Sequence, residues 1–291
     1  MNVPAFEYLR AASLEEACTL LSACGKQGKI IAGGTDILVK MKHRRLIPPC
    51  LIDIKRIPGL DYIRYEDGKG LLVGPLASIE SIKHSLVARK KYPVLHQAAA
   101  YMATVAIRNQ ATLAGNICNG SPSAETAPAL IVLDAEVRIV GRGGERIVPV
   151  EAFFTGPGST VLEPDEVVAE LRIPEPPLGG GAYEKHSLRR MDVAMVGVAA
   201  LIVPEGEACG DVRIVLSAVA PTPIRAKKAE SILRGQVPME ALIEEAARAA
   251  AEESRPITDL RGSAQSRRNI VETLTNQVIH QALRAAKLGV R

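Results

Sequence analysis

The chain has 291 residues, of which 47% are hydrophobic and only 3% aromatic, with no Trp and a formal net charge of +4. This length exceeds that of one ordinary domain and predicts two or three compact units. The scarcity of aromatic rings excludes base-stacking platforms, and the mild, interspersed charge gives no basic tail for a polyanion, so we expect no nucleic-acid partner.

The first 56 residues predict a β/α unit. Ser13 and Glu16 have the spacing of a capping box for a helix over residues 13–24, which Gly25 can stop. Short strands are expected over residues 29–32 and 51–54, because apolar runs there are bounded by Gly and Pro.

A second unit follows, and a segment rich in Pro and Gly at residues 174–181 predicts a linker after it. The strands expected in this second unit span residues 71–73, 136–140 and 167–173, and the expected helices span residues 78–88, 93–102 and 127–133.

Beyond the linker, strands come first and helices later, which is typical of an α+β unit. The expected strands span residues 196–203 and 212–219, and the helices span residues 225–234, 238–252 and 267–286. Apolar residues recur at helical spacing in the last helix and most simply cover the sheet of this unit, although a surface for a partner is the alternative.

No metal, membrane span or export signal is predicted. The five histidines are dispersed, and the five cysteines form no CxxC pair and no metal-ligand spacing. Cys18 and Cys24 are interpreted as small buried residues of one helix. A scattered set of thiols, no run of about 20 apolar residues and no export signal at the N-terminus together predict a cytoplasmic protein.

Two short glycine-bearing stretches are the most informative features. The first glycine segment, residues 32–36, follows an expected strand, and the second glycine segment, residues 112–117, leads into Asn119-Gly120-Ser121-Pro122. Glycine lets successive backbone N–H groups approach a diphosphate closely. Neither segment matches GxGxxG or GxxxxGK[ST], so the pair predicts a divided phosphate cradle of another kind, for a dinucleotide.

In their order along the chain, further stretches extend this pattern: residues 121–128, residues 153–160, Tyr183-Glu184-Lys185 and residues 189–194. Together with the two glycine segments they resemble the FAD-binding medium subunit of the molybdenum hydroxylases, the family of xanthine dehydrogenase and bacterial carbon monoxide dehydrogenase. The resemblance covers nearly the whole chain. It implies an α+β fold with a two-lobed PCMH-type (vanillyl-alcohol-oxidase-like) FAD-binding domain over residues 1–176, with subdomains of about 1–56 and 57–176, and an α+β C-terminal domain over 177–291.

The resemblance also implies where FAD lies. The backbones of Ala32, Gly33, Gly34, Thr35 and Gly115 would hold its diphosphate. Polar contacts would come from Asp36, Thr112, Asn116 and Glu125, and apolar lining from Ile30, Ile31, Met102 and Ile107. The implied cofactor-binding set is completed by Lys29, Ile37, Ala111, Cys118, Asn119, Val168 and Lys185. Lys185 matches a family lysine near the flavin, and its charge could favour an anionic reduced ring or steer an acceptor.

The sequence departs from the family pattern at two positions. Ala114 stands where the family usually has glycine, which narrows the backbone conformations available. Glu125 stands where relatives commonly have Asp, so the carboxylate is carried on a longer arm. Lys185, Arg189 and Arg190 also have a simpler interpretation as a solvated charged edge.

The implied function is electron transfer within a complex: electrons from a molybdenum site pass through [2Fe–2S] clusters to FAD in this chain and then to an external acceptor. Molybdopterin and the clusters would belong to a large and a small partner subunit, in a dimer of heterotrimers. No catalytic side chain is expected, and Ser121 lacks the surroundings of a nucleophile. Two alternatives stay open: a standalone two-lobed FAD oxidoreductase, and a noncatalytic assembly subunit that has lost FAD. Substrate and acceptor stay undefined.

Overall fold

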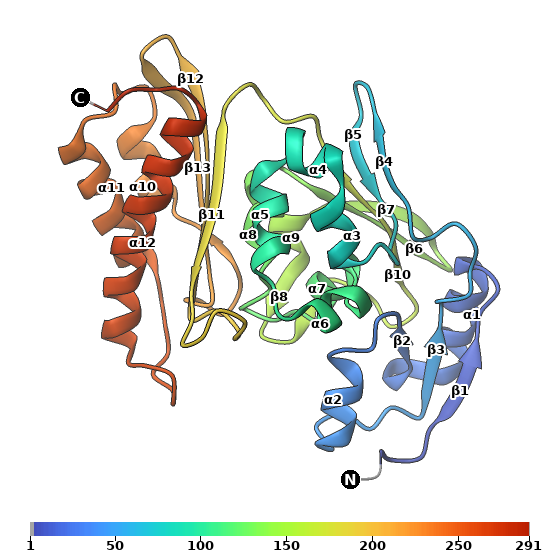
Figure 1. Cartoon of the computed structure of the whole chain (residues 1–291). Helices are drawn as coiled ribbons and strands as arrows, with labels where there is room; N and C mark the ends of the chain where they lie inside the picture. The colour runs from blue at the N-terminus through green and yellow to red at the C-terminus, as the bar shows by residue number, and fades with distance from the viewer. Residues whose placement is uncertain (1–2, 291) are drawn as a thin grey trace.

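The three larger β-sheets follow one another across the molecule with their helices (Figure 1). The computed structural model describes residues 3–290. The N-terminal sheet lies at one end, the central sheet in the middle and the C-terminal sheet beyond a layer of helices. The termini therefore belong to opposite ends of the protein.

The N-terminal sheet is parallel, in the order β1-β3-β2. Its strands are β1 (Glu7–Arg10), β2 (Lys29–Ile31) and β3 (Cys50–Asp53). Helix α1 (Leu14–Cys24) is capped by Ser13, whose hydroxyl accepts from the Glu16 N–H at 3.1 Å. The 3₁₀ turn η1 (Gly25–Gln27) follows it, and α2 (Ile37–Lys42) follows the first glycine segment.

The central sheet is antiparallel, in the order β4-β5-β10-β6-β7. Its strands are β4 (Ile63–Glu66), β5 (Gly70–Val73), β6 (Glu136–Gly141), β7 (Gly144–Pro149) and β10 (Val167–Ile173). Strand β10 joins two cores, because Val167 packs with α1 whereas Val168 packs in the main core of the central unit.

Short helices cover the central sheet and separate it from the C-terminal sheet (Figure 1). They are α3 (Ile79–His84), α4 (Leu86–Lys91), α5 (Pro93–Tyr101), α6 (Val105–Gln110), α7 (Leu113–Cys118), α8 (Ala127–Val132) and α9 (Val150–Phe153). A small hairpin, β8 (Phe154–Gly156) with β9 (Ser159–Thr160), completes the unit.

The C-terminal sheet is an antiparallel meander of β11 (Gly180–His186), β12 (Val196–Glu205), β13 (Ala208–Ser217) and β14 (Ile224–Arg225). Alternate residues of β12 face opposite sides: Val198 and Ala200 join the core under the C-terminal helices, whereas Ala199 and Leu201 join the core of the central unit. Helices α10 (Lys227–Leu233), α11 (Glu240–Glu253) and α12 (Ala264–Ala285) cover the first side.

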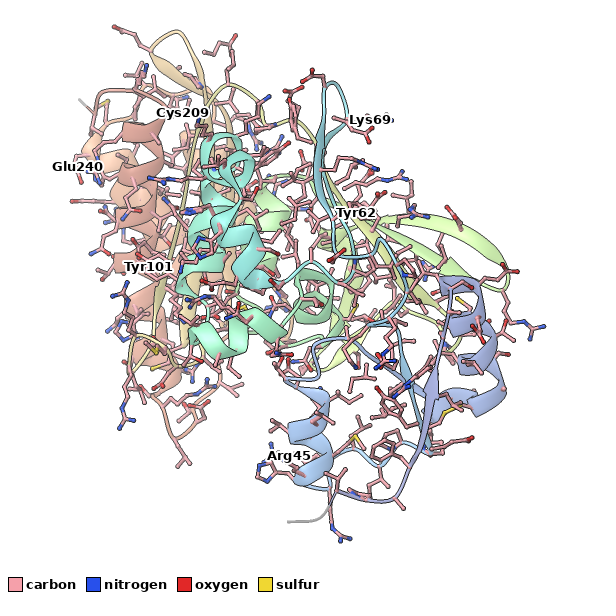
Figure 2. All side chains as sticks on the ribbon, turned by 45° about the vertical axis from the view of Figure 1, so that its right-hand side comes forward. Arg45, Tyr62, Lys69, Tyr101, Cys209 and Glu240 are labelled. Carbon is pink, nitrogen blue, oxygen red and sulfur yellow. A yellow bond between two sulfur atoms is a disulfide. The ribbon has the colours of Figure 1, made fainter. Side chains whose placement is uncertain are left out.

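The two faces of this sheet connect to different helices, as Figure 2 shows for Tyr101, on the side of α5 that faces the sheet, and for Glu240, at the outer start of α11. The Tyr101 hydroxyl donates to Glu184 of β11 at 3.1 Å, and Gln281 of α12 donates to the same carboxylate at 3.1 Å. Leu274, Val278 and Leu283 of α12 are buried against the sheet. The prediction that the last helix covers the sheet of its own unit is confirmed.

Most of the predicted helices and strands are present, but two expectations were wrong in detail. The helix predicted over 78–88 is broken at Ser85, whose hydroxyl accepts from the Ala88 N–H at 3.2 Å and so starts α4. Strand β11 begins inside the predicted linker, at Gly180. A Cβ on Gly180 would lie 2.0 Å from the Ala282 carbonyl oxygen, so glycine serves here to bring a strand against α12.

The interpretation of Cys24 as a simple buried residue is also wrong. Cys24 forms a disulfide with Cys50, with their Cα atoms 6.4 Å apart, whereas Cys18, Cys118 and Cys209 are free. Spacing in the sequence does not reveal this pair, because the parallel sheet brings the end of α1 to the start of β3. Among the helices of residues 3–290, none combines the length and the apolar composition that a bilayer crossing requires.

Candidate functional site

The N-terminal and central units meet at the first glycine segment. A Cβ built on Gly33 would lie 1.9 Å from the carbonyl oxygen of Gln110 and 3.1 Å from the Cα of Ala111. Gln110 ends α6, and Ala111 directly precedes the second glycine segment. Only glycine permits this approach. The backbone of the first glycine segment therefore lies against the residues that directly precede the second one.

The chain turns sharply between β2 and α2. Gly34 has a φ of +75°, in the left-handed region that glycine adopts without strain. The turn leads directly into α2, whose Lys40 donates from Nζ to Oδ1 of Asn119 at 2.5 Å. Lys40 and Asn119 therefore form a second bridge between the two segments, beyond the backbone contact at Gly33.

The second glycine segment is a short helix rather than an open loop. Thr112 caps α7, and its hydroxyl accepts from the Gly115 N–H at 2.9 Å. The Gly115 amide therefore has an internal partner in this structure. Ala114 is 4% exposed and lies inside the helix, where alanine is favourable, so its departure from the family pattern causes no backbone strain here.

The side chains of Asn116 and Glu125 both accept hydrogen bonds from other residues of the protein near α7. The side-chain oxygen of Asn116 accepts from the Thr126 hydroxyl at 2.6 Å and from the Thr126 N–H at 3.3 Å. Glu125 accepts from the Lys185 ammonium, which also donates to the Asp192 carbonyl at 2.9 Å. Asn116 thus fixes the start of α8, and Lys185 of β11 reaches the same segment from the C-terminal sheet.

The Lys185–Glu125 ion pair is buried, with side chains only 2% and 8% exposed. Burial raises the pKa of the Glu125 carboxyl, and the charge and hydrogen bond of Lys185 oppose that rise. Because both members lie away from water, each one depends on the other for electrostatic compensation. The interpretation of Lys185 as a solvated edge residue is wrong, whereas Arg189 and Arg190 are exposed.

The remaining candidates differ in how they are placed. Ile31 and Met102 are buried, whereas Lys29 and Ile107 are exposed. Val168 lies in β10 within the core of the central unit. Desolvation raises the pKa of the Cys118 thiol to about 12, so this thiol is uncharged at neutral pH.

Sequence reasoning missed two contributors to the site. Lys40 is one, and only its position four residues after Asp36 on α2 could have indicated it. The other is the buried pair of Arg108 and Glu80, in which Arg108 also donates to the Met102 and Ala103 carbonyls at 2.9 Å. Arg108 therefore fixes the turn between α5 and α6, and with it the position of Gln110 against Gly33.

The donor set fits a dinucleotide better than a metal ion. The meeting point is formed by backbone atoms, because a Cβ at Gly33 would clash with the carbonyl group of Gln110. Within residues 3–290, no group of three or more His, Cys, Asp or Glu side chains is placed to hold a metal ion. Two lobes that meet through a glycine turn agree with the divided FAD-binding domain that the resemblance implies.

Comparison with known proteins places the chain in a family. Residues 4–176 match the FAD binding domain in molybdopterin dehydrogenase, and residues 181–282 match the CO dehydrogenase flavoprotein C-terminal domain. The chain belongs to the FAD-binding medium subunits of the molybdenum hydroxylases, which are oxidoreductases. The predicted family, fold class and FAD cofactor are confirmed; molybdopterin and iron–sulfur clusters belong to other subunits in the homologous complexes.

Among the relatives, the carbon monoxide dehydrogenase medium chain of Hydrogenophaga pseudoflava is 35% identical over 98% of each chain. The putative xanthine dehydrogenase FAD-binding subunit of Escherichia coli strain K12 is 32% identical over 96% of each chain. A solved structure of carbon monoxide dehydrogenase from Hydrogenophaga pseudoflava, lacking the Mo-pyranopterin moiety of its cofactor, matches with a TM-score of 0.95 at 35% identity, covering 98% of this chain and 99% of that one.

Proposed function

We propose that this chain transfers electrons from the [2Fe–2S] clusters of a partner subunit, through FAD, to an external acceptor. The observation that carries the proposal is the contact of Gly33 with Gln110 and Ala111, which brings two distant stretches of backbone to one place. Bound FAD would supply the reversible electron chemistry, so the chain itself needs no nucleophile or general base.

The side chains would bind and orient the cofactor. Backbone amides of residues 32–35 would face its diphosphate, and Lys185, held by Glu125, would place one positive charge at the flavin end. The full proposed set is Lys29, Ile30, Ile31, Ala32, Gly33, Gly34, Thr35, Asp36, Ile37, Met102, Ile107, Ala111, Thr112, Gly115, Asn116, Cys118, Asn119, Glu125, Val168 and Lys185. For Gly115 the amide hydrogen bond to Thr112 must be shared or replaced when FAD is bound.

We also propose that the partners form a dimer of heterotrimers with this chain. Relatives are named as medium chains or subunits of dehydrogenase complexes, and medium chains of such complexes accompany large and small subunits. A domain boundary near residue 176 is supported by the gap between the two family matches. We also propose a cytoplasmic location: three of the five cysteines are free, and the Cys24–Cys50 disulfide would be reducible in that compartment.

The experiment is to purify the native complex and measure its flavin, molybdenum and iron. We expect about one FAD per copy of this chain, released on denaturation, and bleaching of its absorption when substrate of the complex is added. A complex with full molybdenum and iron but no flavin would contradict the proposal. Turnover by the isolated chain would instead favour a standalone oxidoreductase.

A further inference from the structure

The disulfide closes a loop that contains the entire first glycine segment. Cys24 is the last residue of α1, Cys50 is the first residue of β3, and they are 26 positions apart in the sequence. Between them lie η1, β2, the glycine turn and α2. The only covalent cross-link of the described chain therefore surrounds one half of the proposed cofactor site.

The disulfide also lies close to Gly28, at the start of β2. A Cβ built on Gly28, the residue before this strand, would lie 2.7 Å from Cys24 Cβ and 3.4 Å from Cys50 Sγ. The next residue, Lys29, is paired with Leu51 in the parallel register. The cross-link is thus placed where β2 begins to pair with β3, a few residues before Gly33.

Strand β2 has little else to hold it in the sheet. It has three residues, lies at the edge of the sheet and pairs only with β3. A short edge strand with few backbone hydrogen bonds opens locally at low cost in free energy. A covalent link at its start reduces the conformations that the open segment can reach, and so favours the closed arrangement.

We propose that Cys24 and Cys50 form a reversible thiol–disulfide site that controls how tightly the first glycine segment binds FAD. The inference rests on the proposed FAD site. In the oxidised protein the segment is held against Gln110 and binds the cofactor tightly. In the reduced protein the segment opens more often, and the affinity for FAD falls.

The chemistry requires a dithiol as the reductant. Cys24 is half-buried whereas Cys50 is 2% exposed, so the dithiol's thiolate attacks Cys24 Sγ. The Cys24–Cys50 bond breaks, Cys50 leaves as a thiolate and takes up a proton, and a mixed disulfide forms at Cys24. The second thiol of the reductant then displaces Cys24 as a thiol. Two electrons pass to the protein, and the dithiol becomes a disulfide.

The test compares the flavin-free chain before and after treatment with dithiothreitol, followed by anaerobic desalting. Alkylation under denaturing conditions is expected to label three cysteines before reduction, because two of the five are paired, and all five afterwards. Titration with FAD, followed by quenching of flavin fluorescence, is expected to give a Kd about tenfold higher for the reduced protein.

Hydrogen exchange supplies a readout that does not depend on flavin. Amides of residues 29–37 are expected to exchange faster in the reduced, flavin-free protein, whereas those of α12 stay unchanged. The Cys24→Ser/Cys50→Ser variant is expected to bind FAD weakly with or without dithiothreitol. The matched control is Cys209→Ala, in β13 of the C-terminal sheet, which is expected to keep the response to reduction. If the double variant does not fold, the comparison of the two wild-type forms decides.

The outcomes separate this inference from the proposed function. Five alkylated cysteines before reduction, or equal FAD affinity in the two forms, would overturn the thiol–disulfide control and leave the FAD site intact. Failure of both forms to bind FAD would overturn the proposed cofactor site, and the control with it.

Discussion

The Lys185 ammonium donates to the Glu125 carboxylate across 60 positions of sequence, and both side chains are almost fully buried. This pair links the C-terminal sheet to the segment between α7 and α8. The Lys185 ammonium is the positive charge of the proposed cofactor site, and the fold holds it beside Glu125.

Removing one member of this pair is expected to destabilise the protein more than removing both. Lys185→Met leaves a buried carboxylate without its partner, and Glu125→Gln leaves a buried ammonium, so each should cost about 3 kcal/mol of unfolding free energy. The double variant should cost clearly less than the sum of the two. Urea unfolding of the four proteins measures this coupling. Additive losses would show that the two side chains do not depend on each other.

The Glu80–Arg108 pair predicts a dependence of stability on acid. Burial acts to raise the pKa of the Glu80 carboxyl, but hydrogen bonds from Arg108, Lys83 and His84 lower it from 4.5 to about 2. Because the folded-state pKa lies below the unfolded value, the unfolded chain binds more protons between these limits. The stabilisation is therefore present above about pH 4.5 and is lost as the pH falls toward 2.

The measurement is the difference in unfolding free energy between wild type and Glu80→Gln as a function of pH. The wild-type advantage is expected to shrink steadily from pH 5 to pH 2, since the protonated carboxyl loses its charge-assisted bonds. A difference that stays constant over this range would mean that Glu80 is not held in its ionised form by Arg108.

Removal of two equally buried hydroxyls is expected to change the stability by different amounts. The Ser217 hydroxyl has no hydrogen-bond partner among the protein groups of residues 3–290, whereas the Thr126 hydroxyl donates to Asn116 at 2.6 Å. Ser217→Ala should therefore change stability by less than about 1 kcal/mol, and Thr126→Val should lower it by about 1–2 kcal/mol. Thermal unfolding of both variants checks the contrast. An equal loss for both would contradict it.

Local signals allowed much of the fold to be predicted from the sequence. The Ser13 cap and the apolar face of α1 lie within a dozen residues of sequence. Strand β10 was predicted with its observed bounds because five of its seven residues are apolar and a Pro follows it. The glycine segments were recognisable only as a pair, since Gly33 and Gly34 alone could equally mark a hairpin or the end of a helix.

Features that depend on distant contacts could not be predicted in this way. Cys24 meets Cys50 only because β3 lies beside β2 and α1 ends next to it. In the sequence Gly180 is typical of a linker, and only its close contact with α12 explains why glycine begins a strand there. Lys40 and Arg108 are ordinary charged residues of short helices in the sequence, and their roles at the site follow from partners 79 and 28 positions away.

The two glycine segments are proposed to bind one FAD because their backbones meet at Gly33. The most direct measurement is the FAD affinity of Gly33→Ala beside Gly143→Ala, an exposed glycine whose added Cβ would meet open space. The added methyl at Gly33 must displace the Gln110 carbonyl, so Gly33→Ala is expected to weaken FAD binding by about 100-fold or more while the control binds as wild type. A folded Gly33→Ala protein with unchanged affinity would contradict the account.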